Sequence, residues 1–119
     1  MKLKLSSGTM NILSLEREGR HCDIQELNAQ VGWMNIFAIS GGRVVVLNNS
    51  DGDTVGVAYP IDATRRVEVV LDYNDTYIVS RVRYVVRGSN ANTEVIEHYQ
   101  DGIFCDFVGE TALRTSCWK

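Results

Sequence analysis

The stretch RRVEVVLDYNDTYIVSRVRYVV, residues 65–86, decides the expected fold, because it is typical of two β-strands joined by a short polar turn. β-branched residues dominate both halves, and Asn74-Asp75 between them suits a two-residue hairpin turn. A turn centred there places Glu68 opposite Arg81 on one face of the hairpin. The predicted pairs on the other face are Leu71 with Ile78, Val69 with Ser80, and Val67 with Val82. The stretch therefore predicts an antiparallel sheet with one apolar face and one charged face.

More segments of this kind lie on both sides of the hairpin. The predicted strands span residues 34–40, 43–48, 54–59, 65–73, 76–87, 93–100 and 103–108. Gly41-Gly42 and Asp101-Gly102 are predicted to form two-residue turns, so strands adjacent in the sequence are expected to be adjacent in the sheet. The pattern therefore predicts a β-meander.

One short helix, residues 24–31, is expected before the strands. Asp23 followed three residues later by Glu26 matches a capping box, and Gly32 marks the end of the helix. We therefore predict an α+β fold in which one short N-terminal helix packs on an antiparallel β-meander of about six or seven strands. A β-sandwich or a small barrel with one helix is the alternative. At 119 residues, the chain is expected to form a single domain, 1–119.

The composition disfavours several classes of partner. Twelve basic and 15 acidic residues give a net charge of -3, which provides little attraction to nucleic acid or to an anionic membrane. The opening segment lacks the continuous apolar run of a signal peptide, so a soluble, cytoplasmic protein without a membrane partner is expected. Three cysteines without paired spacing predict neither a disulfide framework nor a zinc ribbon. No metal and no cofactor are expected.

The predicted register gathers arginines and aromatic residues on one outward face. A second hairpin centred on Asp101-Gly102 would place Glu97 opposite Asp106, and a loop at 89–91 would bring Arg83 opposite Glu97 to relieve the repulsion. Arginine and tyrosine are enriched at the hot spots of protein interfaces. The residues predicted to bind a partner on this face are Arg66, Tyr77, Arg81, Arg83, Arg87, Glu97, Tyr99, Phe104 and Asp106.

No P-loop, dinucleotide fingerprint, nucleophile elbow or zinc-protease motif occurs in the sequence. We therefore predict a small non-enzymatic protein-binding module. Small size, mild acidity and a two-faced sheet are shared with inhibitors such as phage anti-CRISPR proteins and toxin-immunity proteins. The expected partner is accordingly another protein, such as a host-defence protein or a toxin, and a homodimer is compatible with the same surface.

Two other functions are weighed against this prediction. A small-molecule-binding β-cup would have an interior that includes Tyr84, His98, Cys105 and Phe107. A cysteine-dependent enzyme would use Cys105, placed opposite His98 by the second hairpin, or Cys22 beside the start of the helix. The same histidine and cysteine residues, with His21 and Cys117, offer ligands for zinc but lack a recognised spacing.

Overall fold

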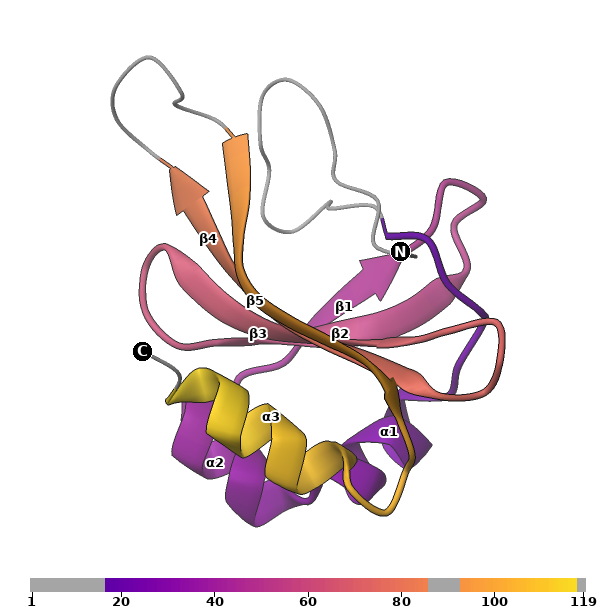
Figure 1. The fold of residues 1–119 in the computed structure, drawn as a ribbon, viewed down its shortest axis with the longest axis horizontal. Coiled ribbons are helices and arrows are strands. Elements are labelled where there is room, and N and C mark those ends of the chain that lie inside the picture. Colours follow the sequence, from indigo (N-terminus) through magenta and orange to yellow (C-terminus); the bar gives the residue numbers. More distant parts are fainter. Residues whose placement is uncertain (1–16, 86–92, 118–119) are drawn as a thin grey trace.

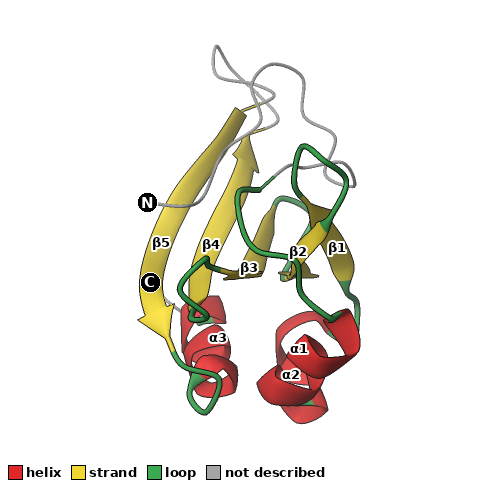
Figure 2. Cartoon of the chain, turned by 90° about the vertical axis from the view of Figure 1, so that its right-hand side faces the viewer, coloured by secondary structure: helices red, strands yellow, loops and turns green. Residues whose placement is uncertain are grey.

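The computed structural model describes residues 17–85 and 93–117, which form an α+β fold of three helices and a five-stranded antiparallel sheet. The strands follow one another in the sheet in chain order: β1 (Val45–Asn48), β2 (Thr54–Pro60), β3 (Arg65–Leu71), β4 (Tyr77–Val85) and β5 (Thr93–Ile103). The helices are α1 (Ile24–Val31), α2 (Trp33–Ser40) and α3 (Val108–Ser116). All three lie on the same side of the curved sheet (Figures 1 and 2). The predicted α+β class and the antiparallel meander are thus confirmed.

Helix α1 has the predicted bounds and the predicted N-cap. The Asp23 carboxylate accepts hydrogen bonds from the backbone N–H groups of Gln25, at 2.9 Å, and Glu26, at 3.5 Å. These bonds satisfy two N–H groups that have no partner inside the helix. Gly32 ends the helix with φ at 91°, a conformation that other residues rarely adopt.

The predicted strand over residues 34–40 is wrong, because this segment forms helix α2. Its side chains at Ile36, Ile39 and Ser40 are buried on one helical stripe, and Gly41 is its C-cap rather than part of a hairpin turn. A short, continuously apolar segment does not distinguish a buried strand from a helix by its periodicity. The contacts of this segment with α3 and with β2 of the sheet stabilise the helix.

The predicted strand over residues 103–108 and the hairpin before it are also wrong. Asp101-Gly102 lies inside β5, where Gly102 has φ at 66° and the pairing with β4 shifts between Tyr77 and Val79. The dipeptide thus belongs to an irregularity in the strand and does not reverse the chain. After Ile103 the chain leaves the sheet and enters α3. The described part of the protein therefore has five strands instead of the predicted six or seven.

The turn between β3 and β4 holds three residues rather than the predicted two. The backbone N–H of Asp72 bonds to the carbonyl of Thr76 at 2.8 Å, and Asp75 has φ at 67°. The strands therefore pair one residue away from the predicted register, with Glu68 opposite Ser80 instead of Arg81. A slip of one residue exchanges the two faces of a strand. The faces of β4 are accordingly the reverse of those predicted.

Apolar side chains are buried on both faces of the sheet. The larger cluster lies under the helices and includes Leu27, Val31, Ile36, Ile39, Val57, Tyr59, Val67, Val69, Tyr77, Val79, Val108 and Ala112. A smaller cluster contains Leu47, Val55, Ala58 and Val70, with Val45 and Tyr84 packed against it. The second cluster shows that the face of the sheet away from the helices is also partly buried.

Gly109 allows α3 to pack tightly against the junction of α1 and α2. A Cβ atom at this position would lie 2.3 Å from the carbonyl oxygen of Val31 and 2.8 Å from Nδ2 of Asn35. Asn35 Nδ2 itself donates to that carbonyl oxygen at 2.8 Å. Only a residue without a side chain permits this approach of the helices.

Candidate functional site

The face of the sheet opposite the helices carries a buried ion cluster of two arginines and two glutamates: Arg17, Arg66, Glu68 and Glu94. Arg17 donates to both carboxylate oxygens of Glu68, at 2.6 and 2.8 Å, and also pairs with Glu94. Arg66 bridges the same two glutamates at 2.7 and 3.0 Å. All four side chains are at most 5% exposed. Because the cluster is buried and its formal charges balance, we assign it a structural role.

The ion pairs within this cluster shift the pKa values of Glu68 and Arg17. Burial by itself would raise the pKa of Glu68, but the charges and hydrogen bonds of Arg17 and Arg66 outweigh it and hold the pKa below its ordinary value. Burial would likewise lower the pKa of Arg17, and Glu68 and Glu94 reverse this effect. Glu68 and Arg17 therefore stay charged at neutral pH.

A second cluster of charges lies on the helix side of the sheet and contains three of the predicted partner-binding residues. In this Glu97 cluster, the Glu97 carboxylate accepts from Nε of Arg81 at 3.0 Å, Arg65 at 3.2 Å and Arg83 at 3.2 Å. The predicted register that places Arg83 opposite Glu97 is wrong, because the residue opposite Arg83 is Val95, but the two side chains do form an ion pair. Arg81 also donates to the carbonyl of Ser116 at 2.9 Å, which places the cluster at the C-terminal end of α3.

The other predicted partner-binding residues that the structure describes do not join the Glu97 cluster on one exposed surface. Tyr77 is buried under the helices, and Arg66 is buried in the ion cluster on the opposite face. Tyr99 lies opposite Ser80, while Phe104 and Asp106 lie in the exposed loop between β5 and α3. Arg87 lies outside the described residues. The single outward face predicted from the sequence is therefore wrong, because the register slip and the irregularity in β5 separate its members.

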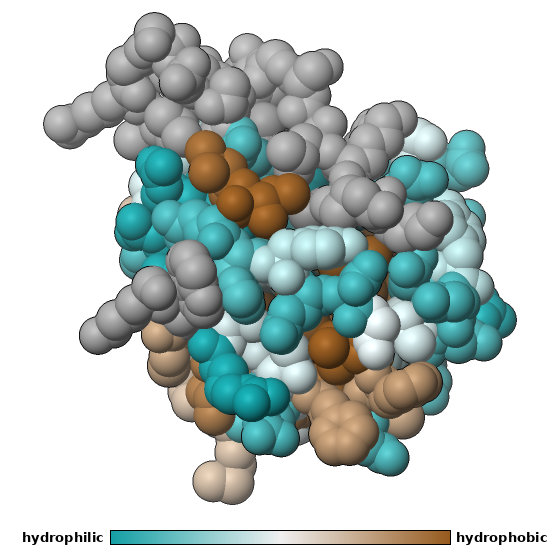
Figure 3. All heavy atoms as spheres, in the orientation of Figure 1, coloured by the Kyte–Doolittle hydropathy of each residue, from teal (hydrophilic) through white to brown (hydrophobic). Residues whose placement is uncertain are grey.

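Helix α2 exposes an apolar surface that sequence reasoning missed. Trp33, Met34 and Phe37 are 50%, 89% and 62% exposed, and the two rings lie 6.4 Å apart. We call these three side chains the α2 face. In Figure 3 apolar side chains gather along the lower edge, over the helices. No clear signal in the sequence marks this surface, because the apolar residues of this segment run almost without interruption on both sides of the helix.

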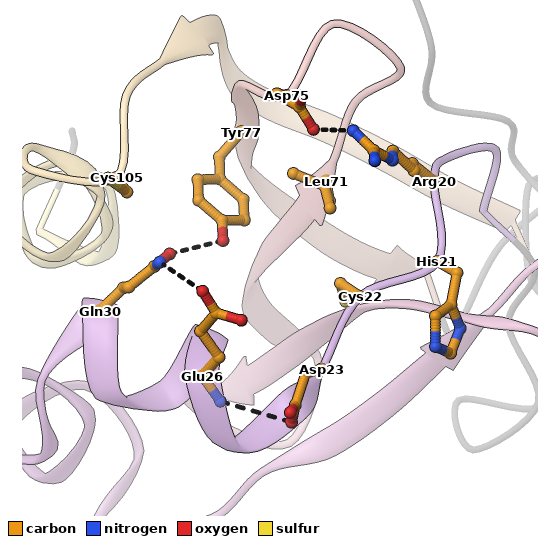
Figure 4. Close-up of a pocket in the computed structure, with 10 residues that line it drawn as sticks. All are labelled: Arg20, His21, Cys22, Asp23, Glu26, Gln30, Leu71, Asp75, Tyr77 and Cys105. Carbon is orange, nitrogen blue, oxygen red and sulfur yellow. Dashed lines mark hydrogen bonds and ion pairs between the residues drawn. The ribbon is translucent and has the colours of Figure 1, made fainter.

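A hollow of about 310 Å³ opens where α1, the turn between β3 and β4, and the loop after β5 meet (Figure 4). Ten residues line it, and three carboxylates among them, Asp23, Glu26 and Asp75, face one arginine, Arg20. Arg20 already pairs with Asp75. The volume is at the lower end of the range for small-molecule pockets.

Two groups in this hollow are held in their neutral forms. Burial, followed by the charges of Asp23 and Glu26, raises the pKa of the Cys22 thiol to about 11. Burial and nearby groups, among them Cys22 and Glu26, raise the pKa of Tyr77 to about 12. A thiol in this state is a poor nucleophile. The hollow therefore favours binding over cysteine chemistry at Cys22.

The residues proposed for the alternative functions are not brought together. His98 lies opposite Arg81, not Cys105, which is exposed in the loop after β5. Tyr84 packs on the face away from the helices, and Phe107 is 57% exposed, so the predicted interior of a β-cup is not formed. Within residues 17–85 and 93–117, no group of three or more His, Cys, Asp or Glu side chains is arranged to hold a metal ion.

Comparisons of the chain with family models, curated proteins and solved structures give no match. In the part of the chain that the structure describes, no helix has the length and apolar character needed to cross a bilayer. The function must therefore be inferred from the surfaces of the protein itself.

Proposed function

We propose that the protein is a small non-enzymatic protein-binding module that docks on its partner through the α2 face. The observation that carries this proposal is the exposure of Trp33, Met34 and Phe37 on a helix of only two turns. Contiguous exposed apolar surface is characteristic of interaction sites, and tryptophan, methionine and phenylalanine are enriched in protein interfaces.

The geometry of the α2 face suits insertion into a groove. Its residues occupy positions i, i+1 and i+4, and they therefore project from adjacent parts of one helical surface. The opposite stripe, with Ile36 and Ile39, is anchored in the core, so the helix is already folded before it meets a partner. This arrangement matches the recognition mode in which an amphipathic helix lays its apolar side chains into an apolar groove.

The charge beside this surface specifies the partner further. Helix α3 packs next to α2, and the Glu97 cluster lies at the C-terminal end of α3. Three guanidinium groups surround the Glu97 carboxylate, and Asp62 lies 3.5 Å from Arg65, so the ion pairs of the described residues join three positive charges to two negative ones. A partner with an apolar groove and an acidic rim is complementary to both features.

A site-directed cross-link tests the proposal. We would place the photo-crosslinking residue benzoylphenylalanine at Met34 and, as a control, at Asp51, an exposed residue in the turn between β1 and β2. After irradiation in the native cells, position 34 is expected to yield a defined adduct that position 51 does not yield. Mass spectrometry of the adduct identifies the partner, and a product of twice the chain mass identifies a homodimer.

A matched variant separates recognition from stability. Replacing both Trp33 and Phe37 with Ser is expected to abolish the adduct at position 34 while leaving the unfolding midpoint nearly unchanged, since both side chains are largely exposed. If the same adduct forms equally from position 51, or survives the double substitution, the α2 face is not the docking surface.

A further inference from the structure

The hydrogen bonds in the hollow run in one direction and end on a carboxylate. Tyr77 donates its O–H to Oε1 of Gln30 at 2.6 Å, and Gln30 Nε2 lies 3.4 Å from Oε1 of Glu26 (Figure 4). The donors of Tyr77 and Gln30 are thus directed at acceptors that also line the hollow. The second carboxylate oxygen of Glu26 has no hydrogen-bond partner among the described residues. The chain therefore presents an acceptor to whatever enters the hollow.

The charges around the hollow favour a cation. Neither Asp23 nor Glu26 forms an ion pair with a basic residue in the described ranges, whereas Arg20 is engaged by Asp75. One oxygen of Asp23 caps α1, and its negative charge offsets the positive end of this helix. Two carboxylates without a counterion thus lie one helical turn apart at the mouth of the hollow.

Cys22 forms a buried part of the lining of the hollow. This residue is only 8% exposed, its side chain lines the hollow, and its thiol has no hydrogen-bond partner within the part of the chain that the structure describes. Leu71 and Tyr77 also line the hollow (Figure 4). The inner part of the hollow is therefore weakly polar and suits a short hydrocarbon stem.

From this arrangement we propose that the hollow binds an alkylammonium or guanidinium group on a short apolar stem. The cationic head lies at the Glu26 and Asp23 carboxylates, and the stem lies against Leu71, Cys22 and Tyr77. Two sources offer this chemistry: a free aliphatic amine, or a lysine or arginine side chain of a bound protein. The proposal does not depend on the α2 face, which lies on a different helix.

Titration of the full ¹⁵N-labelled chain with n-butylammonium chloride at constant ionic strength tests the site. Saturable shifts are expected for the amide resonances of Cys22, Glu26 and Tyr77. Neutral 1-butanol, which has nearly the same size, is expected to bind at least about tenfold more weakly, because it carries no positive charge to pair with the Glu26 and Asp23 carboxylates. Equal binding of the two probes would overturn the proposal.

The variant Glu26→Gln keeps the size of the side chain and removes its charge. It is expected to weaken n-butylammonium binding about tenfold, whereas Asp51→Asn, which removes the charge of a residue that does not line the hollow, leaves binding unchanged. An unaltered affinity in Glu26→Gln, with a folded spectrum, contradicts the assignment of the cationic head.

A third titration distinguishes the two sources. A capped lysine, N-acetyl-lysine-N-methylamide, has a peptide backbone that a free amine lacks. Binding at least as tight as that of n-butylammonium supports a side chain of a partner as the natural ligand. If the amine binds and the capped lysine does not, the same site serves a free small molecule.

Discussion

Two clusters of arginine and glutamate lie on opposite faces of the same sheet, and they differ in charge balance and exposure. The buried ion cluster pairs two arginines with two glutamates, and its side chains are at most 5% exposed. The Glu97 cluster holds three arginines around one carboxylate, and its side chains are 16–36% exposed. Similar residue types thus occur in two different environments. The closed cluster is buried within the fold, whereas the open cluster is the one that we propose to lie against the acidic rim of a partner.

The largest effect is expected from breaking the buried cluster. Glu68→Gln leaves Arg17 and Arg66 buried with one carboxylate fewer, and removal of one partner from a buried ion pair costs about 3–5 kcal/mol. Glu97→Gln is the matched control in the open cluster and is expected to cost about 1 kcal/mol, because solvent screens its partners. Urea denaturation measures both values. Equal losses of stability would show that burial does not separate the two clusters.

The same contrast between closed and open surfaces exists on the two sides of α2. Ile36 is fully buried in the core, and Ile36→Ala is expected to lower the free energy of unfolding by about 2–4 kcal/mol. Phe37 is the next residue and is largely exposed, so Phe37→Ala is expected to change the free energy of unfolding by only about 0.5 kcal/mol. A large loss in Phe37→Ala would mean that the α2 face stabilises the fold and is not reserved for a partner.

A titration with acid should distinguish the clusters next. Because the pKa of Glu68 is lower in the folded protein than its ordinary value of 4.5, its contribution to stability is present above pH 4.5. This contribution is lost as the pH falls through the lower, folded pKa, at up to about 1.4 kcal/mol per pH unit. Chemical denaturation of the wild type between pH 6 and pH 3 measures the loss. Glu68→Gln is expected to show a smaller slope, and an identical slope would exclude Glu68 as its source.

A small effect on stability, together with an effect on partner binding, is expected from a change in the Glu97 cluster. Arg83→Glu should change the free energy of unfolding by about 1 kcal/mol or less, since Arg83 is 36% exposed. It should nevertheless reduce the yield of the Met34 cross-link and remove its dependence on salt. Arg114→Glu, which makes the same charge change on the exposed side of α3, serves as the control. The same reduction in both variants would indicate a nonspecific effect of net charge.

Local signals in the sequence predicted part of this fold correctly. Asp23, Glu26 and Gly32 define α1 through interactions within a few residues, and the β-branched segments locate all five described strands. The buried positions of α3 at Val108, Thr111, Ala112 and Thr115 also have a helical spacing, which could have identified this helix. Helix α2 could not be recognised in this way, because its apolar residues run almost without interruption.

The candidate sites depended on details that a sequence does not fix. One additional residue in the turn before Thr76 reversed the faces of β4, and the irregularity around Gly102 removed the expected final hairpin. Arg83 and Glu97 still meet, because long charged side chains reach across a diagonal of the sheet. The pairing of Glu68 with Arg17 could not be inferred, since Arg17 lies 51 residues away in the chain.

The tight packing at Gly109 has a consequence for how the hollow would receive a ligand. Because α3 touches the junction of α1 and α2 without an intervening side chain, the three helices should shift as one body. The hollow is bounded by α1 and by the loop that leads into α3, so we expect the separation of these two walls to change little. A hollow whose shape is set in this way would lose little conformational entropy when a cation enters.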